Sequence, residues 1–369
     1  MEELQFKRAA IVGVGLIGGS LALALKKKGY KGTIIGIDEP HVLEKALRRK
    51  AIDEPYPSDE LLKGLSDADL VFLCTPISRI ILLLQTIGNS LKPGALVTDV
   101  GSIKRKIVET ANLYMPAHCD FIGGHPMAGA EVRGIDGADP FLFENAAWVL
   151  TPGKPVDEKK RRAFGDLLES IGAKVLLLQP RLHDEIAAAV SHLPQMAAVA
   201  LMNMAAGYNE QSPFFLKMAA GGFRDMTRVA SSPFGIWKDI CSANADMIEH
   251  FIDAYIQELQ KVKSILHDSH EMELYFNRAA RSRLAIPTDT KGFLKPQYEI
   301  SVAVEDKPGV LAALANILAA EAINIKDIEV LKIREDEGGT FRLAFGEQAD
   351  QERAIELLTA AGYECRKRG

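Results

Sequence analysis

A single histidine stands inside a run of small residues and a proline, in the stretch GGHPMAG over residues 123–129. Glycines let the backbone approach a facing group closely, and Pro126 fixes the chain directly after His125. An imidazole titrates near neutral pH, so it can accept a proton while a substrate is oxidised. A structural histidine bonded to the backbone is the alternative. We expect His125 to be a general base in the loop that follows the strand-like run DFIGG.

A dinucleotide-binding pattern lies near the amino end. Gly13, Gly15 and Gly18 form G-x-G-x-x-G between a strand-like run and a helix-like run, and Asp38 ends the next strand-like run. The glycines suit a tight turn, a close pyrophosphate and close packing of helix on strand, while the helix N-terminus offers N–H groups to the phosphates. Asp38 can accept from the ribose hydroxyls and would repel a 2′-phosphate, so we expect NAD rather than NADP. A glycine-rich turn without a ligand is the alternative. The expected cofactor-binding residues are Gly13, Gly15, Leu16, Ile17, Gly18, Asp38 and Thr75.

Further polar residues follow other strand-like and helix-like runs. Ser102, in TDVGSIK, either faces the nicotinamide and the substrate or caps the next helix. Glu131 either tunes the charge of the pocket or is an ordinary acidic loop residue. His192 and Gln195, in SHLPQ, interrupt an apolar helix near a proline kink, so they need structural partners or a ligand.

Two clusters of charge lie further along. Arg228, at the end of FRDMTR, is our candidate for binding a carboxylate through two hydrogen bonds, whereas Arg224 and Asp225 can simply pair with each other. The stretch HDSHEME over residues 267–273 resembles a metal cluster only loosely. We interpret its histidines as solvent-facing and expect no metal.

Composition narrows the class of protein. The chain has 369 residues, 47% apolar and 25% charged, which suits two or three soluble domains. A net charge of −5 gives no basic surface of the kind that binds nucleic acid. Four separated cysteines suggest neither disulfides nor a zinc site. The apolar stretch 187–206 contains a serine, a histidine, a proline and a glutamine, so we expect no membrane span and a cytoplasmic location.

The order of the elements predicts an architecture. Residues 1–180 alternate strand-like runs (AAIVGV, TIIGI, LVFLC, ALVTDV, AKVLLL) with amphipathic helices, which indicates a doubly wound α/β domain of buried parallel strands. Residues 181–284 form long helices that are apolar on more than one face, so we expect an all-α domain that forms a homodimer. Residues 285–297 resemble a linker, and 298–369 show the order βαββαβ of a ferredoxin-like unit.

Together these motifs resemble the prephenate dehydrogenases of tyrosine biosynthesis, in the monofunctional form that ends in an ACT domain. The likeness covers nearly the whole chain and rests on GVGLIGGSLALAL, DVGSIK, GGHPMAGAE, SHLP, GGFRDMTR and Trp237. The stretch EDKPGVLAALANILAAEAINIKDIEV resembles the opening of an ACT domain. The resemblance implies a Rossmann-type NAD-binding domain, a helical dimerisation domain and an ACT regulatory domain.

The resemblance also implies the reaction and the roles. The family carries out NAD-dependent oxidative decarboxylation of prephenate to 4-hydroxyphenylpyruvate. By motif position, His125 is the catalytic histidine on the ring hydroxyl, Ser102 supports it, and Arg228 binds the ring carboxylate that is lost. The remaining substrate-binding residues implied are His192, Gln195, Glu131 and Trp237.

One residue departs from the family pattern. A second histidine often follows the proline of SHxPH, where this chain has Gln195, which cannot carry a charge. The alternatives are therefore arogenate dehydrogenase or an enzyme that accepts both substrates. A β-hydroxyacid dehydrogenase is disfavoured because LHDEIAAAVSHLPQ offers no lysine base. A non-catalytic amino-acid sensor is the alternative from another class.

The ACT domain suggests feedback by tyrosine. An ordinary turn at DKPG and an ordinary strand start at NI are the alternatives to an effector site. The effector-binding residues that we expect are Asp306, Gly309, Val310, Leu311, Asn324 and Ile325.

Overall fold

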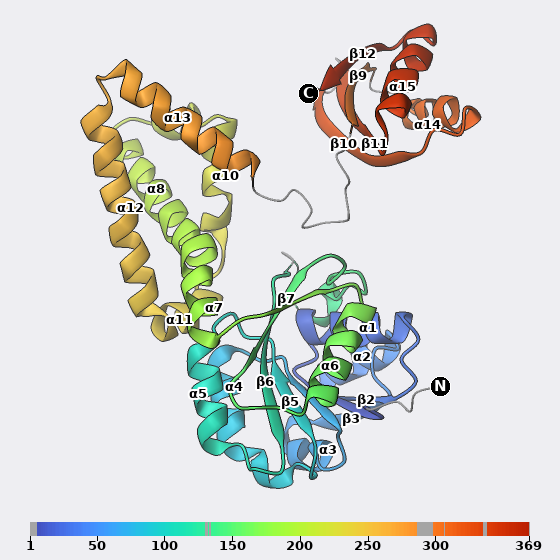
Figure 1. The fold of residues 1–369 in the computed structure, drawn as a ribbon, viewed down its shortest axis with the longest axis vertical. Coiled ribbons are helices and arrows are strands. Elements are labelled where there is room, and N and C mark those ends of the chain that lie inside the picture. Colours follow the sequence, from blue (N-terminus) through green and yellow to red (C-terminus); the bar gives the residue numbers. More distant parts are fainter. Residues whose placement is uncertain are drawn as a thin grey trace. The chain divides into compact units, whose positions relative to one another are not determined.

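The computed structural model describes residues 6–129, 132, 134–285, 298–305, 307–334 and 338–368. The chain divides into two compact units, Met1–Thr290 and Lys291–Gly369, and each is described by itself (Figure 1). Of the predicted linker at 285–297, residues 286–297 lie outside the described residues. The domain boundaries predicted at 180 and 284 stay predictions.

An eight-stranded sheet forms the centre of the first unit, in the order β3-β2-β1-β4-β5-β6-β7-β8. Neighbours are parallel from β3 to β6, β7 runs antiparallel to β6, and β8 is parallel to β7. The strands are β1 (Arg8–Val12), β2 (Thr33–Asp38), β3 (Glu54–Pro57), β4 (Leu70–Leu73), β5 (Leu96–Asp99), β6 (Asp120–Pro126), β7 (Ala147–Pro152) and β8 (Lys174–Leu177).

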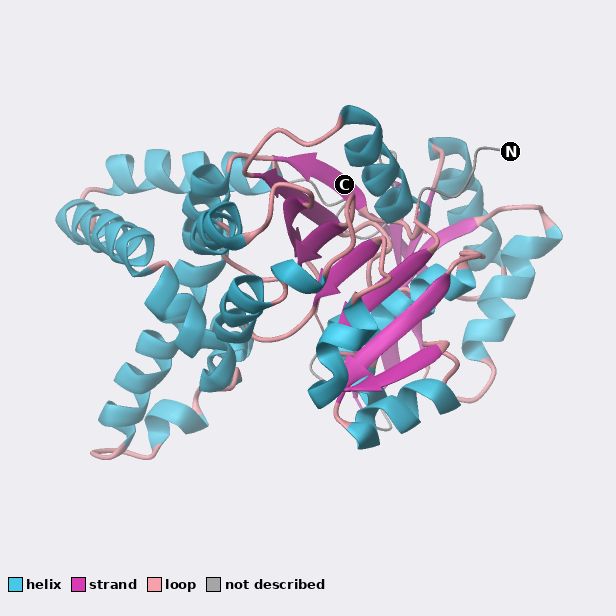
Figure 2. Cartoon of the chain, turned by 90° about the horizontal axis from the view of Figure 1, so that it is seen from below, coloured by secondary structure: helices cyan, strands magenta, loops and turns pink. Residues whose placement is uncertain are grey.

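Helices cover both faces of this sheet, as Figure 2 shows. Side chains alternate along a strand, so Ala9 and Ile11 of β1 join one apolar core while Ala10 and Val12 join the other. The first core is completed by α1 (Leu16–Lys27), α2 (Pro40–Arg48) and α6 (Glu158–Ser170). The second is completed by α3 (Leu61–Leu65), α4 (Ile77–Thr86) and α5 (Arg105–Tyr114). The doubly wound α/β fold is therefore confirmed.

Three details of the sheet differ from the expectation. The run AKVLLL forms β8, but it is not buried, because Leu176 and Leu177 at this edge of the sheet are about half exposed. Strands β3 and β7 were not predicted; β3 has the sequence EPYP, and prolines are tolerated only on an edge strand. His125 lies within β6 rather than in a loop, opposite Val149 of β7.

The rest of the first unit is helical, which confirms the predicted all-α segment. Its main elements are α7 (Pro180–Ala187), the π-helical turn η4 (Ala188–His192), α8 (Leu193–Asn209), α9 (Phe214–Lys217), α10 (Gly221–Thr227), η5 (Arg228–Ser231), α11 (Phe234–Ala243), α12 (Ala245–Ile265) and α13 (Ser269–Leu284). Within the described residues, Pro180–Asn209 is the one helical stretch long and apolar enough to cross a membrane. It also buries His183, Asp184 and His192 against the rest of the unit.

The second unit is a four-stranded antiparallel sheet in the order β10-β11-β9-β12. Its elements are β9 (Tyr298–Val304), α14 (Val310–Ala320), β10 (Ile325–Arg334), β11 (Gly338–Phe345), α15 (Gln348–Ala360) and β12 (Glu364–Arg368). Apolar residues of both helices and of the sheet form its core. The predicted βαββαβ order is confirmed.

Candidate active site

Four parallel strands bring the predicted motifs to one edge of the large sheet. The carboxyl ends of β1, β4, β5 and β6 all lie at this edge, because these strands are parallel neighbours. Gly13 follows β1, Thr75 follows β4, Ser102 follows β5, and His125 is near the end of β6. Three strand spacings of about 4.8 Å put His125 roughly 14 Å across the sheet from the glycine loop, a distance that an extended dinucleotide can span.

The three glycines of the loop have three different surroundings. Gly13 has a φ of +93°, a backbone conformation that residues with a side chain rarely adopt. Its backbone packs against the Cys74 carbonyl, where an added Cβ would not fit. A Cβ at Gly15 would meet nothing within 4 Å, so the space above it is open. A Cβ at Gly18 would lie 2.1 Å from the Gly13 carbonyl oxygen. The tight turn, the open space for a phosphate and the close contact of helix on strand are thus all present. Helix α1 starts at Leu16, directly after Gly15, and contains Ile17 and Gly18.

A pocket beside this loop is lined by Gly13, Gly15, Asp38 and Thr75. The Asp38 carboxylate accepts hydrogen bonds from the N–H of Val14 at 2.7 Å and of Glu39 at 2.7 Å. The Thr75 hydroxyl is buried and has no hydrogen-bond partner among the described residues. A buried polar atom without a partner is what a bound group would satisfy. The pocket therefore fits the ribose and phosphate part of a dinucleotide.

A buried ion pair braces the ends of β5 and β6. The ammonium of Lys104 pairs with the Asp99 carboxylate and donates to the Gly124 carbonyl at 2.6 Å; both side chains are fully buried. Asp99 also accepts from the N–H of Gly101 at 2.8 Å and of Gly124 at 3.1 Å. Burial raises the pKa of Asp99 and lowers that of Lys104, while the ion pair opposes both shifts. This brace fixes the backbone on both sides of Ser102 and next to His125.

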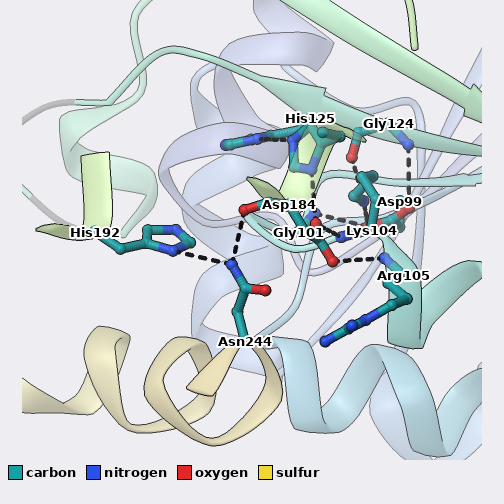
Figure 3. Close-up of polar contacts among 10 residues, drawn as sticks. Asp99, Gly101, Lys104, Arg105, Gly124, His125, Asp184, His192 and Asn244 are labelled. Atoms are coloured by element: carbon teal, nitrogen blue, oxygen red, sulfur yellow. Dashed lines mark hydrogen bonds and ion pairs between the residues drawn. The ribbon is translucent and has the colours of Figure 1, made fainter. Parts of the chain in front are cut away.

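Two residues that sequence reasoning missed lie directly against His125. The His183 ring is 2.8 Å from that of His125, and Asp184 is 2.8 Å from the other side of the His183 ring. Figure 3 labels His125 and Asp184, the two ends of this arrangement. Both come from α7, and both are buried. The signal was present in the sequence: His183 and Asp184 precede Ala187 and Ala188 by one helical turn, so they share the apolar face.

Burial controls the charge of His125. The side chain is 9% exposed, and desolvation holds its pKa well below 6.5. The positive charges that His183, Lys104 and His192 can carry act in the same direction. At neutral pH, His125 is a neutral imidazole with a lone pair available to accept a proton.

His192 lies at the end of the π-helical turn that joins α7 to α8. Its Nδ1 is 3.3 Å from the Asn244 amide nitrogen, and its ring meets Trp237 edge-on at 6.0 Å between centroids. Burial lowers the pKa of His192 to about 4. The structure therefore brings two predicted residues, His192 and Trp237, into contact.

The predicted carboxylate-binding segment is tied to the same helix. The Gln195 amide donates to the Val229 carbonyl at 2.9 Å, directly after Arg228, so one side of Gln195 already has a structural partner. Arg228 is exposed, and its guanidinium has no ion pair among the described residues. Nor do the described contacts include an ion pair between Arg224 and Asp225, which was the alternative for these two residues.

The two remaining predicted residues of the site are Ser102 and Glu131. Ser102 does not cap the next helix, because α5 begins at Arg105 and Asp184 accepts the N–H groups of Lys104 and Arg105. Glu131 lies outside the described residues.

The second unit has a pocket of its own. It is lined by Gly309, Val310 and Leu311, together with Lys307 and residues of β9 and β11. Asn324 and Ile325 do not line it, and Asp306 lies outside the described residues. Three of the six expected effector-binding residues are thus at one pocket.

Three family models match successive parts of the chain. They are "Prephenate dehydrogenase, nucleotide-binding domain" over residues 21–177, "Prephenate dehydrogenase, dimerization domain" over 179–278 and "ACT domain" over 298–362. A prephenate dehydrogenase of Bacillus subtilis (strain 168) is 36% identical over 96% of this chain and 96% of its own. The chain belongs to the prephenate dehydrogenase family.

Solved structures of prephenate dehydrogenase relatives agree with this placement. The prephenate dehydrogenase from A. aeolicus, in complex with hydroxyphenyl propionate and NAD+, is 32% identical, with a TM-score of 0.71 over 78% of this chain and 100% of that one. The Synechocystis arogenate dehydrogenase is 34% identical, with a TM-score of 0.66 over 75% of this chain and 100% of that one. The predicted resemblance is confirmed, and the sensor and β-hydroxyacid dehydrogenase alternatives are set aside.

Proposed function

We propose that this chain oxidises and decarboxylates prephenate to 4-hydroxyphenylpyruvate with NAD, with His125 as the base. The observation that carries the proposal is a buried, neutral histidine at the sheet edge that also carries a dinucleotide pocket. The cofactor prediction is confirmed at the level of the family, since the first domain matches the family's nucleotide-binding domain and a relative was solved with NAD+.

Each group in the site has a separate role in the reaction. Bound NAD supplies the acceptor for the hydride of the ring carbon that bears the hydroxyl. Neutral His125 takes the hydroxyl proton as the alcohol becomes a ketone, and Ser102 orients that oxygen. Loss of the ring carboxylate as carbon dioxide leaves its electron pair in the ring, which becomes aromatic. His125 then returns its proton to the resulting phenolate oxygen, so protons and electrons balance.

Arg228 is our candidate for holding the carboxylate that is lost. Its guanidinium is exposed and unpaired among the described residues, and its segment is fixed by the hydrogen bond from Gln195 to Val229. A guanidinium can bind a carboxylate through two parallel hydrogen bonds. His192, Gln195 and Trp237 would form the wall on the side of the helical domain, and Glu131 would tune its charge.

Substrate choice is the point on which relatives differ. Similar chains include a prephenate dehydrogenase and an arogenate dehydrogenase, and prephenate and arogenate differ in a keto against an amino group. Gln195 cannot carry charge, so nothing at that position attracts or repels the ammonium of arogenate. We retain prephenate as the preferred substrate, with a dual-specificity enzyme as the alternative.

The test is the rate of NADH formation with prephenate and with arogenate at equal concentrations and saturating NAD. We expect a higher kcat/KM with prephenate. A higher value with arogenate would replace the proposed substrate, and no NADH from either would remove the proposed function.

Regulation and assembly complete the proposal. The ACT domain supports an amino-acid effector, which we propose is tyrosine, at the pocket of Gly309, Val310 and Leu311. The dimerisation-domain match supports the predicted homodimer, in which exposed apolar side chains such as Met204, Tyr208 and Phe215 would be covered. The cytoplasmic location stays a prediction.

A further inference from the structure

Three buried side chains form a line of hydrogen bonds that ends at His125. His125 Nδ1 lies 2.8 Å from His183 Nε2, and His183 Nδ1 lies 2.8 Å from Asp184 Oδ1. Exposure falls along the line, from 9% at His125 to 3% at His183 and 1% at Asp184. Water therefore does not compete for these contacts, and the atoms that meet along the line must satisfy one another.

The far end of the line is fixed by main-chain groups. Asp184 Oδ1 accepts from the N–H of Lys104 at 2.6 Å, and Oδ2 accepts from that of Arg105 at 2.8 Å, both at the N-terminus of α5. The Asp184 carbonyl accepts from the Asn244 amide at 2.9 Å. The carboxylate therefore cannot rotate away from His183, and Figure 3 shows it held between these partners.

The positions of the hydrogens follow from what each group can do. A carboxylate can only accept, so His183 Nδ1 must carry the hydrogen between it and Asp184. A neutral His183 then has a bare Nε2, which must accept from His125. His125 consequently carries its hydrogen on Nδ1, and its lone pair is on Nε2.

The other charged groups near His125 do not alter this order. The Lys104 ammonium is bonded to Asp99 and to the Gly124 carbonyl. His192 Nδ1 faces Asn244 rather than either of the other two imidazoles. Neither residue therefore sets the position of the hydrogen on the His125 ring.

We propose that His183 and Asp184 are positioning residues that keep the lone pair of His125 on Nε2, where it can take the substrate's proton. This proposal rests on the proposed role of His125 as the base. When Nε2 gains that proton, the imidazolium keeps its hydrogen bond to His183, whose lone pair faces the new positive charge. The geometry thus favours the proton-bearing state of His125 without moving any other group.

The test separates orientation from packing with two variants of one residue. His183→Leu introduces an apolar side chain of similar bulk and removes the acceptor. His183→Gln offers an amide oxygen that can still accept from His125 Nδ1. We expect His183→Leu to lower kcat about 10- to 100-fold, with little change in the KM for prephenate or for NAD. His183→Gln should recover part of that loss.

Several results would overturn the proposal. These are a wild-type kcat in His183→Leu, a change in KM alone, or a Gln variant no better than the Leu variant. His118→Leu is the control, because His118 contacts the Leu91 carbonyl away from this site and should leave kcat unchanged. NAD binding and thermal unfolding, measured on all variants, show which of them are folded.

A spectroscopic measurement keeps the proposal testable if the Leu variant does not fold. With ¹⁵N-labelled histidine in the intact wild-type enzyme, the His125 signals, assigned by their loss in His125→Asn, should show a protonated Nδ1 and a bare Nε2. A protonated Nε2 at neutral pH would overturn the proposal. This measurement needs no turnover, so it decides the tautomer even if prephenate proves not to be the substrate.

Discussion

At His125, burial and the neighbouring ammonium of Lys104 act together on the pKa of the imidazole. Both hold the pKa of the imidazole well below 6.5, so protonation during the reaction is transient and the neutral base is the resting state. A base that stays neutral is ready for the next substrate. The neutral form of His125 is lost once the pH falls through its lowered pKa. The low pKa therefore moves the acid limit of activity downward.

This predicts the pH profile of kcat/KM. Activity depends on the neutral form, so we expect the acid limb to have its midpoint below 6.5. His125→Asn should lower kcat about 10²- to 10⁴-fold and remove that limb, because an amide does not titrate. NAD affinity, measured by titration, should remain close to that of the wild type. An acid limb at or above 6.5, or near-wild-type turnover in His125→Asn, would contradict the assignment.

Among the elements, α1 shows how a short motif specifies both packing and binding. Gly18 lies where α1 crosses β1, and an added methyl group there would overlap the Gly13 carbonyl. Gly15, three residues earlier, faces open space at the cofactor pocket. The two glycines therefore have separable functions in one loop.

Alanine substitutions should separate these functions. Gly18→Ala should destabilise the fold by about 2 kcal/mol or more, which is roughly 4–8 °C in Tm. The reason is that the new methyl group would meet the Gly13 carbonyl, and a main-chain group cannot move aside as a flexible side chain can. Gly15→Ala should leave the Tm nearly unchanged but weaken NAD binding, since its methyl group would enter the space left for the cofactor. Both quantities can be measured by thermal unfolding and NAD titration. Equal Tm values for the two variants would contradict this account.

The elements also show how far the sequence leads. Alternating apolar runs predict most strands and helices of the doubly wound sheet, and the glycine spacing predicts the cofactor pocket. The EPYP strand was missed because its prolines argue against a strand. Strand β7 was missed because it pairs antiparallel with β6, and the sequence of one strand does not show which partner it pairs with or in which direction. His183 and Asp184 were missed because a dipeptide on a helix does not show which neighbour it contacts. Tertiary contacts, rather than local preference, decide such positions.

At the scale of the whole molecule, the described residues form two compact units with separate pockets. The pocket of the second unit involves Gly309, which has a φ of +90° at the start of α14 and open space where a side chain would be. An amino-acid effector bound there can act on catalysis only by favouring one state of the enzyme over another. Tyrosine sensitivity should therefore be separable from turnover.

Deletion of residues 297–369 tests this separation. We expect the shortened enzyme to retain NAD-dependent turnover and to lose inhibition by tyrosine, because residues 1–290 contain the nucleotide pocket and the His125 site. Gly309→Val is a full-length companion, since a β-branched residue is strained at that φ and would fill the pocket. It should reduce tyrosine inhibition with turnover unchanged. If the shortened enzyme were still fully inhibited, tyrosine would bind in the first unit, and competition with prephenate would identify the active site as its position.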